Sequence, residues 1–220
     1  MFKGFTDATA SFFWDLQFNN ERPWFQEHRD AFETNLNQPF KELGKDTFAI
    51  LQQRYPLGDF ELHLSRIYRD ARRLFGRGPY KDSLWFSIRD PKNGGADPAF
   101  FFEITPRGWC FGMGFYSARA QEMEAFRKSI DANPERFRRL AASVGRMKEF
   151  VLEGPEYKRP KGDYGKVINE WYNRRYVSLV SEHDYDDWLM SEELPQKLAD
   201  AFGKLMPMYE YLNQYTKEMV

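Results

Sequence analysis

The chain has 220 residues, of which 42% are hydrophobic and 30% charged, a composition that excludes a disordered protein and favours one globular domain. Its 33 acidic and 32 basic side chains leave a formal net charge of -1, which argues against wholesale polyanion binding but permits a local basic patch. With one cysteine, no long apolar run and no basic-then-apolar leader, we expect no disulfide framework, no membrane span and a cytoplasmic location.

Apolar residues at helical spacing predict three helices in the first quarter of the chain. The first covers 6–18 with Thr6 or Asp7 as its N-cap, the second begins at Pro23 and reaches about residue 35, and the third covers 39–54. Aromatic residues make up 18% of the chain while Leu, Ile and Val are sparse, so we expect aromatic side chains to fill much of the core.

The pattern then changes to the alternation of β-strands. It predicts strands over 62–69, 84–89, 100–104 and 109–115, separated by turn-forming segments rich in Gly and Pro. Because these strands follow one another closely, an antiparallel meander is the simplest pairing.

Helical spacing returns after the meander. It predicts helices over 123–130 and 134–144 and a long C-terminal helix from Pro195 that Pro207 should kink, while 176–180 is a candidate edge strand. The whole chain therefore predicts a single α+β domain: helices within 6–55, a mainly antiparallel meander of about four to five strands within 60–116, and helices and loops from 118 to 220.

Signatures of known chemistry are absent from the sequence. It contains no GxGxxG, P-loop, GxSxG, HExxH or CxxC motif, and its three histidines lack metal-ligand spacing, so we predict neither a metal nor a cofactor. Cys110 lies in an aromatic strand segment, which is more typical of a small core residue than of a nucleophile.

The densest local signal is the segment 66–81. Six of its sixteen residues are basic and only Asp70 is acidic. Guanidinium groups make paired hydrogen bonds to carboxylate or phosphate, so this segment predicts an anion site; the alternative is a solvated loop whose arginines pair with carboxylates of the protein itself. If strand alternation holds, one face of the meander would gather a set of polar residues: Arg66, Tyr68, Arg89, Glu103 and Tyr116.

Two further segments allow two interpretations each. Asn19, Asn20 and Trp24 either cap and staple the first helices or border the basic segment. The basic stretch within 158–166 is either a solvated turn or a second anion-contacting loop; its cations are Lys158, Arg159, Lys161 and Lys166.

Several motifs resemble those of one bacterial protein family. They are Asn19-Asn20-x-x-x-Trp24-Phe25, Arg66-x-x-Arg69-Asp70-x-Arg72 followed by Pro79-Tyr80-Lys81, Gly112-x-Gly114-x-Tyr116, Arg127-x-x-Ile130, and Leu205-x-Pro207 with Leu212-Asn213. In this order they identify the chain as a member of the conserved family called domain of unknown function 2461. The resemblance implies no established reaction, cofactor or substrate. Two departures concern its site: residues 74–77 replace a Phe-Ser-x-Asp-Lys-type stretch, and His28 stands where Asn is expected.

The leading hypothesis is a protein that binds a small anionic ligand, a class that includes phosphorylated molecules. Glu103 would act as acid or base, and the remaining candidates would bind or orient the ligand: Arg66, Arg69, Arg72, Tyr80, Lys81, Arg89 and Tyr116. Supporting positions behind them would be Asn19, Asn20, Trp24 and Arg127. The alternatives are a nucleic-acid-binding protein that uses the Arg-rich segment and aromatic stacking, or a non-catalytic interaction protein; the oligomeric state stays open.

Overall fold

A six-stranded antiparallel sheet organises the protein. The computed structural model describes residues 1–56, 58–70, 72, 74, 76–91, 97–116 and 118–217, with side chains to 214. The strands lie in the order β1-β2-β3-β4-β6-β5, and every neighbouring pair is antiparallel. Their bounds are β1 Glu61–Leu64, β2 Leu84–Arg89, β3 Ala99–Ile104, β4 Trp109–Gly114, β5 Val151–Glu153 and β6 Ser178–His183. The predicted single α+β domain is confirmed, and β2, β3 and β4 match their predicted ranges within one residue.

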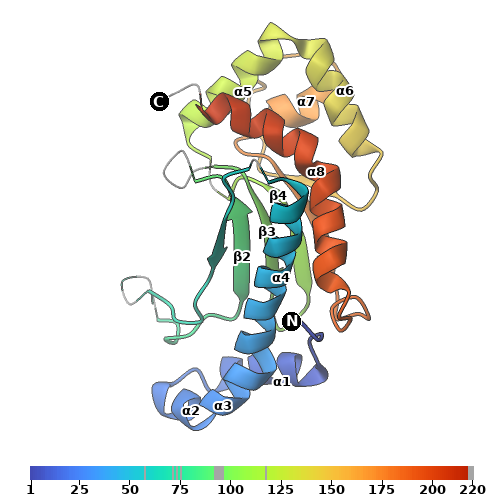
Figure 1. The fold of residues 1–220 in the computed structure, drawn as a ribbon. Coiled ribbons are helices and arrows are strands. Elements are labelled where there is room, and N and C mark those ends of the chain that lie inside the picture. The colour runs from blue at the N-terminus through green and yellow to red at the C-terminus, as the bar shows by residue number, and fades with distance from the viewer. Residues whose placement is uncertain are drawn as a thin grey trace.

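One face of the sheet packs against two long helices, α4 (Gln38–Arg54) and α8 (Leu194–Lys217) (Figure 1). The aromatic residues predicted to fill the core do so here: the Phe100 ring lies 5.0 Å from Phe202 and 4.7 Å from Tyr209 of α8, and Phe40 of α4 lies 6.1 Å from Phe86. The opposite face keeps exposed apolar side chains, including Trp85 at 36% exposure and Val151 at 63%. Strand alternation explains the asymmetry, since successive side chains point to opposite faces.

The N-terminal helices lie at one end of the sheet (Figure 1). Helix α1 (Asp7–Phe18) begins after Thr6, as predicted. The predicted second helix is interrupted: α2 (Arg22–Glu27) ends at His28, α3 (Arg29–Phe32) follows, and a π-helical turn (Glu33–Asn37) leads into α4. The His28 ring stacks on Trp24 at 4.1 Å, and its Nδ1 donates to the Trp24 carbonyl at 2.8 Å. The same carbonyl also accepts the backbone N–H of His28 at 3.1 Å, so the His28 side chain adds a second donor at the end of α2.

The first strand is shorter than predicted. After Leu64 the Trp85 amide donates to Oγ of Ser65, at 2.9 Å, so a side chain takes the place of a backbone acceptor and the regular ladder ends. Tyr68 re-forms a single bridge with Tyr80. Arg66 and Tyr68, expected on a continuous strand, therefore lie on a connecting segment, and both are exposed.

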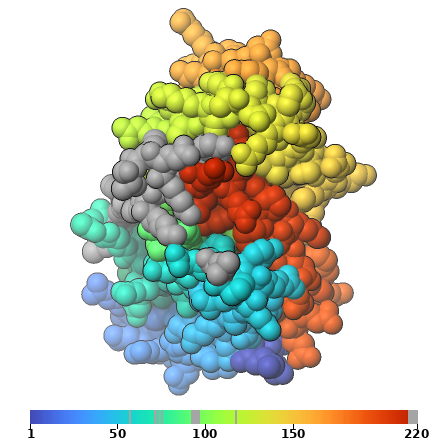
Figure 2. Space-filling view, turned by 45° about the horizontal axis from the view of Figure 1, so that its top comes forward, coloured from blue at the N-terminus to red at the C-terminus, as the bar shows by residue number. Residues whose placement is uncertain are grey.

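The C-terminal half adds helices α5 (Ala120–Ala132), α6 (Pro134–Gly145) and α7 (Lys166–Tyr172) at the other end of the molecule, as Figures 1 and 2 both show. The candidate edge strand is corrected: β6 lies inside the sheet between β4 and β5, and the short β5 forms the edge. Three residues are too few for alternation to reveal β5 in the sequence. Helix α8 continues through Pro207, and Figure 1 shows it changing direction along its length.

Candidate functional site

Two segments about sixty positions apart in the sequence are joined by a pair of hydrogen bonds. The Asn20 amide nitrogen donates to the Tyr80 carbonyl, and the Tyr80 amide donates to Asn20 Oδ1, both at 3.0 Å. Gly78 lies so close that a Cβ there would come within 2.3 Å of the Asn20 side chain. Asn20 thus anchors the Pro-Tyr-Lys segment to the start of α2, which supports the stabilising interpretation of this residue.

Arg69 holds the same segment from the other side. Its Nε donates to the Gly78 carbonyl at 3.2 Å and its Nη2 to the Tyr80 carbonyl at 3.0 Å, while an ion pair to Asp82 is long at 3.9 Å. The side chain is only 14% exposed. Much of the hydrogen-bonding capacity of this guanidinium is therefore used by backbone carbonyls, so Arg69 contributes mainly to positioning the segment.

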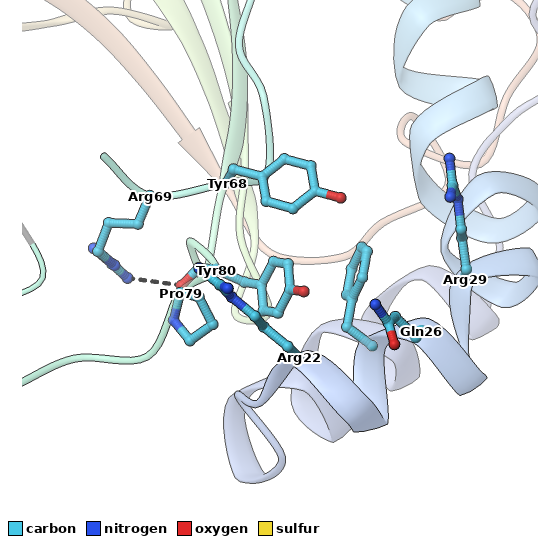
Figure 3. Close-up of a pocket in the computed structure, with 8 residues that line it drawn as sticks. Arg22, Gln26, Arg29, Tyr68, Arg69, Pro79 and Tyr80 are labelled. Carbon is cyan, nitrogen blue, oxygen red and sulfur yellow. Dashed lines mark hydrogen bonds between the residues drawn. The ribbon is translucent and has the colours of Figure 1, made fainter. Parts of the chain in front are cut away.

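A pocket of about 250 Å³ lies between this anchored segment and the helices α2 and α3 (Figure 3). Phe25 of α2 stacks on Tyr80 with ring centroids 4.1 Å apart and meets the Tyr68 ring edge-on at 6.0 Å. Figure 3 shows the hydroxyl ends of Tyr68 and Tyr80 directed toward the helices. The pocket is lined by Arg22, Phe25, Gln26, Arg29, Tyr68, Arg69, Pro79 and Tyr80.

The pocket is positively charged. Among the described residues, neither Arg22 nor Arg29 forms a salt bridge, and both are exposed. Burial, and to a smaller extent Tyr68, raises the pKa of Tyr80, while Arg22 acts in the opposite direction. The Tyr80 hydroxyl therefore stays protonated at neutral pH and can donate a hydrogen bond. Burial and the neighbouring Arg69 lower the pKa of Lys81 beside the pocket.

Other candidates from the Arg-rich segment lie outside the pocket. Arg72 is exposed and makes two hydrogen bonds to the Asp70 carboxylate, at 3.1 and 2.8 Å. This pairing with an acid of the chain matches the alternative stated above, and the Asp70 carboxylate raises the pKa of Arg72. Arg66 is exposed and Lys81 half-buried, and neither lines the pocket. Residues 71, 73 and 75 of the segment lie outside the described residues.

The five residues expected to converge on one sheet face are separated. The register does place Arg89 and Glu103 on the same face, with Glu103 opposite Trp85 and Cys110. However, Arg89 is the last residue of β2, about 17 Å from the end at which the Arg-rich segment enters the sheet. Tyr116 follows β4 at that same far end and is fully exposed. Antiparallel strands run past each other, so residues that follow strands of opposite direction emerge at opposite ends.

The supporting positions are likewise dispersed. Asn19 caps α1, its side chain donating to the Asp15 carbonyl at 2.9 Å, and Trp24 packs against Phe12 and His28. Arg127 lies on α5, at the end of the molecule opposite α2 (Figure 1). The supporting residue that hydrogen-bonds the described part of the pocket wall is Asn20.

The pocket residues on α2 and α3 were not predicted from the sequence. Arg22, Phe25, Gln26 and Arg29 stand at positions i, i+3, i+4 and i+7, which is the spacing of one helix face. That spacing was available in the sequence. The missing information was that this face meets Tyr68 and Tyr80, which only the long-range contact through Asn20 provides.

Cys110 has the character of an inert thiol. Burial raises its pKa to about 12, and three carboxylates act in the same direction: Glu103, Glu182 and Glu153. A thiol that is almost wholly protonated at neutral pH is a poor nucleophile. The expected core position is wrong: Cys110 is half-buried and lies opposite Glu103, on the face of the sheet away from α4 and α8. Within the described part of the chain, no group of His, Cys, Asp and Glu side chains could hold a metal ion.

Ser181, His183 and Asp186 are connected in the order of a catalytic triad. Ser181 Oγ lies 2.9 Å from His183 Nε2, and His183 Nδ1 lies 3.4 Å from Asp186 Oδ2. A catalytic serine must reach its substrate, whereas Ser181 is only 4% exposed on the helix-covered face of the sheet. The His183 ring also stacks on Trp109 at 4.3 Å, and Trp109 Nε1 donates to Asp186. We interpret the group as a packing network.

The fold and the pocket define a two-layer α+β protein with a cationic, aromatic-walled site beside its N-terminal helices. The chain belongs to the family of conserved hypothetical proteins designated DUF2461, whose model matches residues 8–211. The resemblance seen in the sequence motifs is thereby confirmed. No curated protein matches the chain in sequence. Across the described residues, no helix is long and apolar enough to span a membrane.

Proposed function

We propose that the protein binds a small anionic ligand, with a phosphate group as the best-fitting anion, in the pocket between α2, α3 and the Tyr68–Tyr80 bridge. The observation that carries this proposal is the pair Arg22 and Arg29, which border the pocket without salt bridges to described residues. One guanidinium group can donate two parallel hydrogen bonds to two oxygens of a phosphate, and the hydroxyls of Tyr68 and Tyr80 add neutral donors.

The size of the pocket limits the ligand. At about 250 Å³ it is slightly smaller than most sites for drug-sized molecules, which begin near roughly 300 Å³. It suits a phosphorylated fragment or a phosphate with one ring, and Tyr68, 57% exposed at the rim, offers a face against which such a ring can stack.

The proposed activity is binding, with no reaction assigned. The described lining residues include no carboxylate, imidazole or thiol that could transfer a proton or attack a bond. Glu103, the acid–base candidate of the sequence analysis, lies on the exposed sheet face and outside the pocket lining.

The test is a thermal-shift screen of phosphorylated metabolites and nucleotides, because a ligand that binds only the folded state raises the melting temperature. Arg29→Gln should weaken about tenfold the binding of a hit that occupies this pocket, the effect expected for one charge-assisted hydrogen bond. Arg146→Gln, which changes an exposed arginine at the C-cap of α6, is the matched control and should leave the hit unchanged. Arg69→Ala is a poor test because it also releases the pocket wall.

Equal binding by wild-type protein and Arg29→Gln would contradict this site. A hit confined to oligonucleotides, with an affinity that falls steeply with salt, would instead favour the nucleic-acid hypothesis.

A further inference from the structure

Three cationic side chains surround the ring of Tyr157, in the loop that follows β5. Lys161 Nζ lies 4.8 Å from the ring centroid, and the Cζ atoms of Arg127 and Arg175 lie 5.6 Å from it. They come from α5, from the loop itself and from the segment before β6. Attraction to an aromatic ring explains each contact singly, but three positive charges around one ring also repel one another.

Two carboxylates close in sequence to these residues, Asp131 and Glu156, have other partners. Asp131 Oδ1 accepts hydrogen bonds from the hydroxyls of Tyr164 at 2.6 Å and Tyr172 at 2.9 Å. Glu156 lies 3.7 Å from Arg174. Considering the described residues alone, none of the three cations around Tyr157 forms a salt bridge. Their mutual repulsion is therefore not offset by direct contact with an acid of the described part of the chain.

One of these cations also has an unused donor. The Nη1 atom of Arg127 is buried and has no hydrogen-bond partner among the described residues. A buried guanidinium nitrogen without an acceptor is unfavourable, and such groups are normally paired. Three more basic side chains nearby in the sequence are exposed: Lys158 and Arg159 of the loop, and Lys166 at the start of α7.

We propose that the Tyr157 cluster is a second binding site, specific for a phosphate group and independent of the pocket beside α2. Arg127, Lys161 and Arg175 contact the phosphate oxygens, while the Tyr157 ring keeps the three cations together. The bound anion offsets their repulsion and supplies an acceptor near Arg127. Because α5 and α7 lie at the opposite end of the molecule from α2 (Figures 1 and 2), the two sites do not share residues.

Direct binding measurements at low salt test this proposal with two probes, inorganic pyrophosphate and a short single-stranded oligothymidine. Lys161→Gln and Arg175→Gln change exposed side chains, so both variants should fold normally and each should weaken binding about five- to tenfold. Their matched controls, Lys148→Gln and Arg146→Gln, also remove exposed charges and should bind like wild-type protein. Arg29→Gln weakens the pocket beside α2, so it should leave unchanged the part of the binding that Lys161→Gln removes, which separates the cluster from the pocket.

Binding of both probes indicates recognition of the phosphate group itself. Binding of the oligonucleotide alone assigns the phosphate to a nucleic-acid backbone. Either result supports the site if Lys161→Gln weakens the binding of the probe. The proposal is overturned if neither probe binds, or if Lys161→Gln and Arg175→Gln bind like wild-type protein. It is also overturned if the control variants lose as much affinity as Lys161→Gln and Arg175→Gln.

Discussion

Replacement of Asn20 with alanine should destabilise the protein by about 2–4 kcal/mol, measured by denaturant unfolding. The substitution removes both hydrogen bonds to Tyr80, and the partly buried backbone amide of Tyr80 loses its acceptor, Asn20 Oδ1. Because Phe25 stacks on Tyr80, the aromatic wall of the pocket should loosen as well, and ligand binding at Arg22 and Arg29 should weaken in the same variant.

Asn19→Ala is the matched control for this prediction. The neighbouring asparagine bonds only the exposed Asp15 carbonyl at the end of α1, so its replacement should cost less than about 1 kcal/mol. Equal losses of stability in the two variants would show that the contact between Asn20 and Tyr80 contributes little.

Gly78→Ala should produce the second large effect, a loss of about 2–4 kcal/mol in the free energy of unfolding. The new Cβ would lie 2.3 Å from Asn20 Oδ1 and 2.6 Å from the Asn20 carbonyl oxygen, so the side chain that holds Tyr80 must move away. Gly145→Ala is the control, since its Cβ would meet nothing within 4 Å and should be tolerated.

A double-mutant cycle connects these two predictions. In the Asn20→Ala background the side-chain clash is gone, so Gly78→Ala should cost clearly less there than in wild-type protein. Additive losses would mean that Gly78 and Asn20 act independently, contrary to the geometry described above.

The sheet could be predicted well from the sequence because alternation is a local signal. Strands β2, β3 and β4 follow directly from the period of their apolar residues. The position of β6 could not be predicted, because it depends on pairing with β4 over a long sequence separation. The break at His28 coincides with a side-chain hydrogen bond to the Trp24 carbonyl, which periodicity does not report.

The candidate site was predicted only in part for the same reason. The charge density of 66–81 pointed to one wall of the pocket, since Tyr68, Arg69 and Tyr80 line it. Arg22 and Arg29 join them through tertiary contacts that no local pattern specifies. Composition also could not distinguish Arg72, which pairs with Asp70, from the arginines without such partners.

The most direct test of the pocket is an NMR titration with pyrophosphate that follows the side-chain Nε–H signals of individual arginines. The proposal predicts saturable shifts at Arg22 and Arg29 that Asn20→Ala weakens, with Arg72 unaffected. Shifts confined to Arg72 and Arg77, or no change at Arg22 and Arg29 at any concentration, would contradict it.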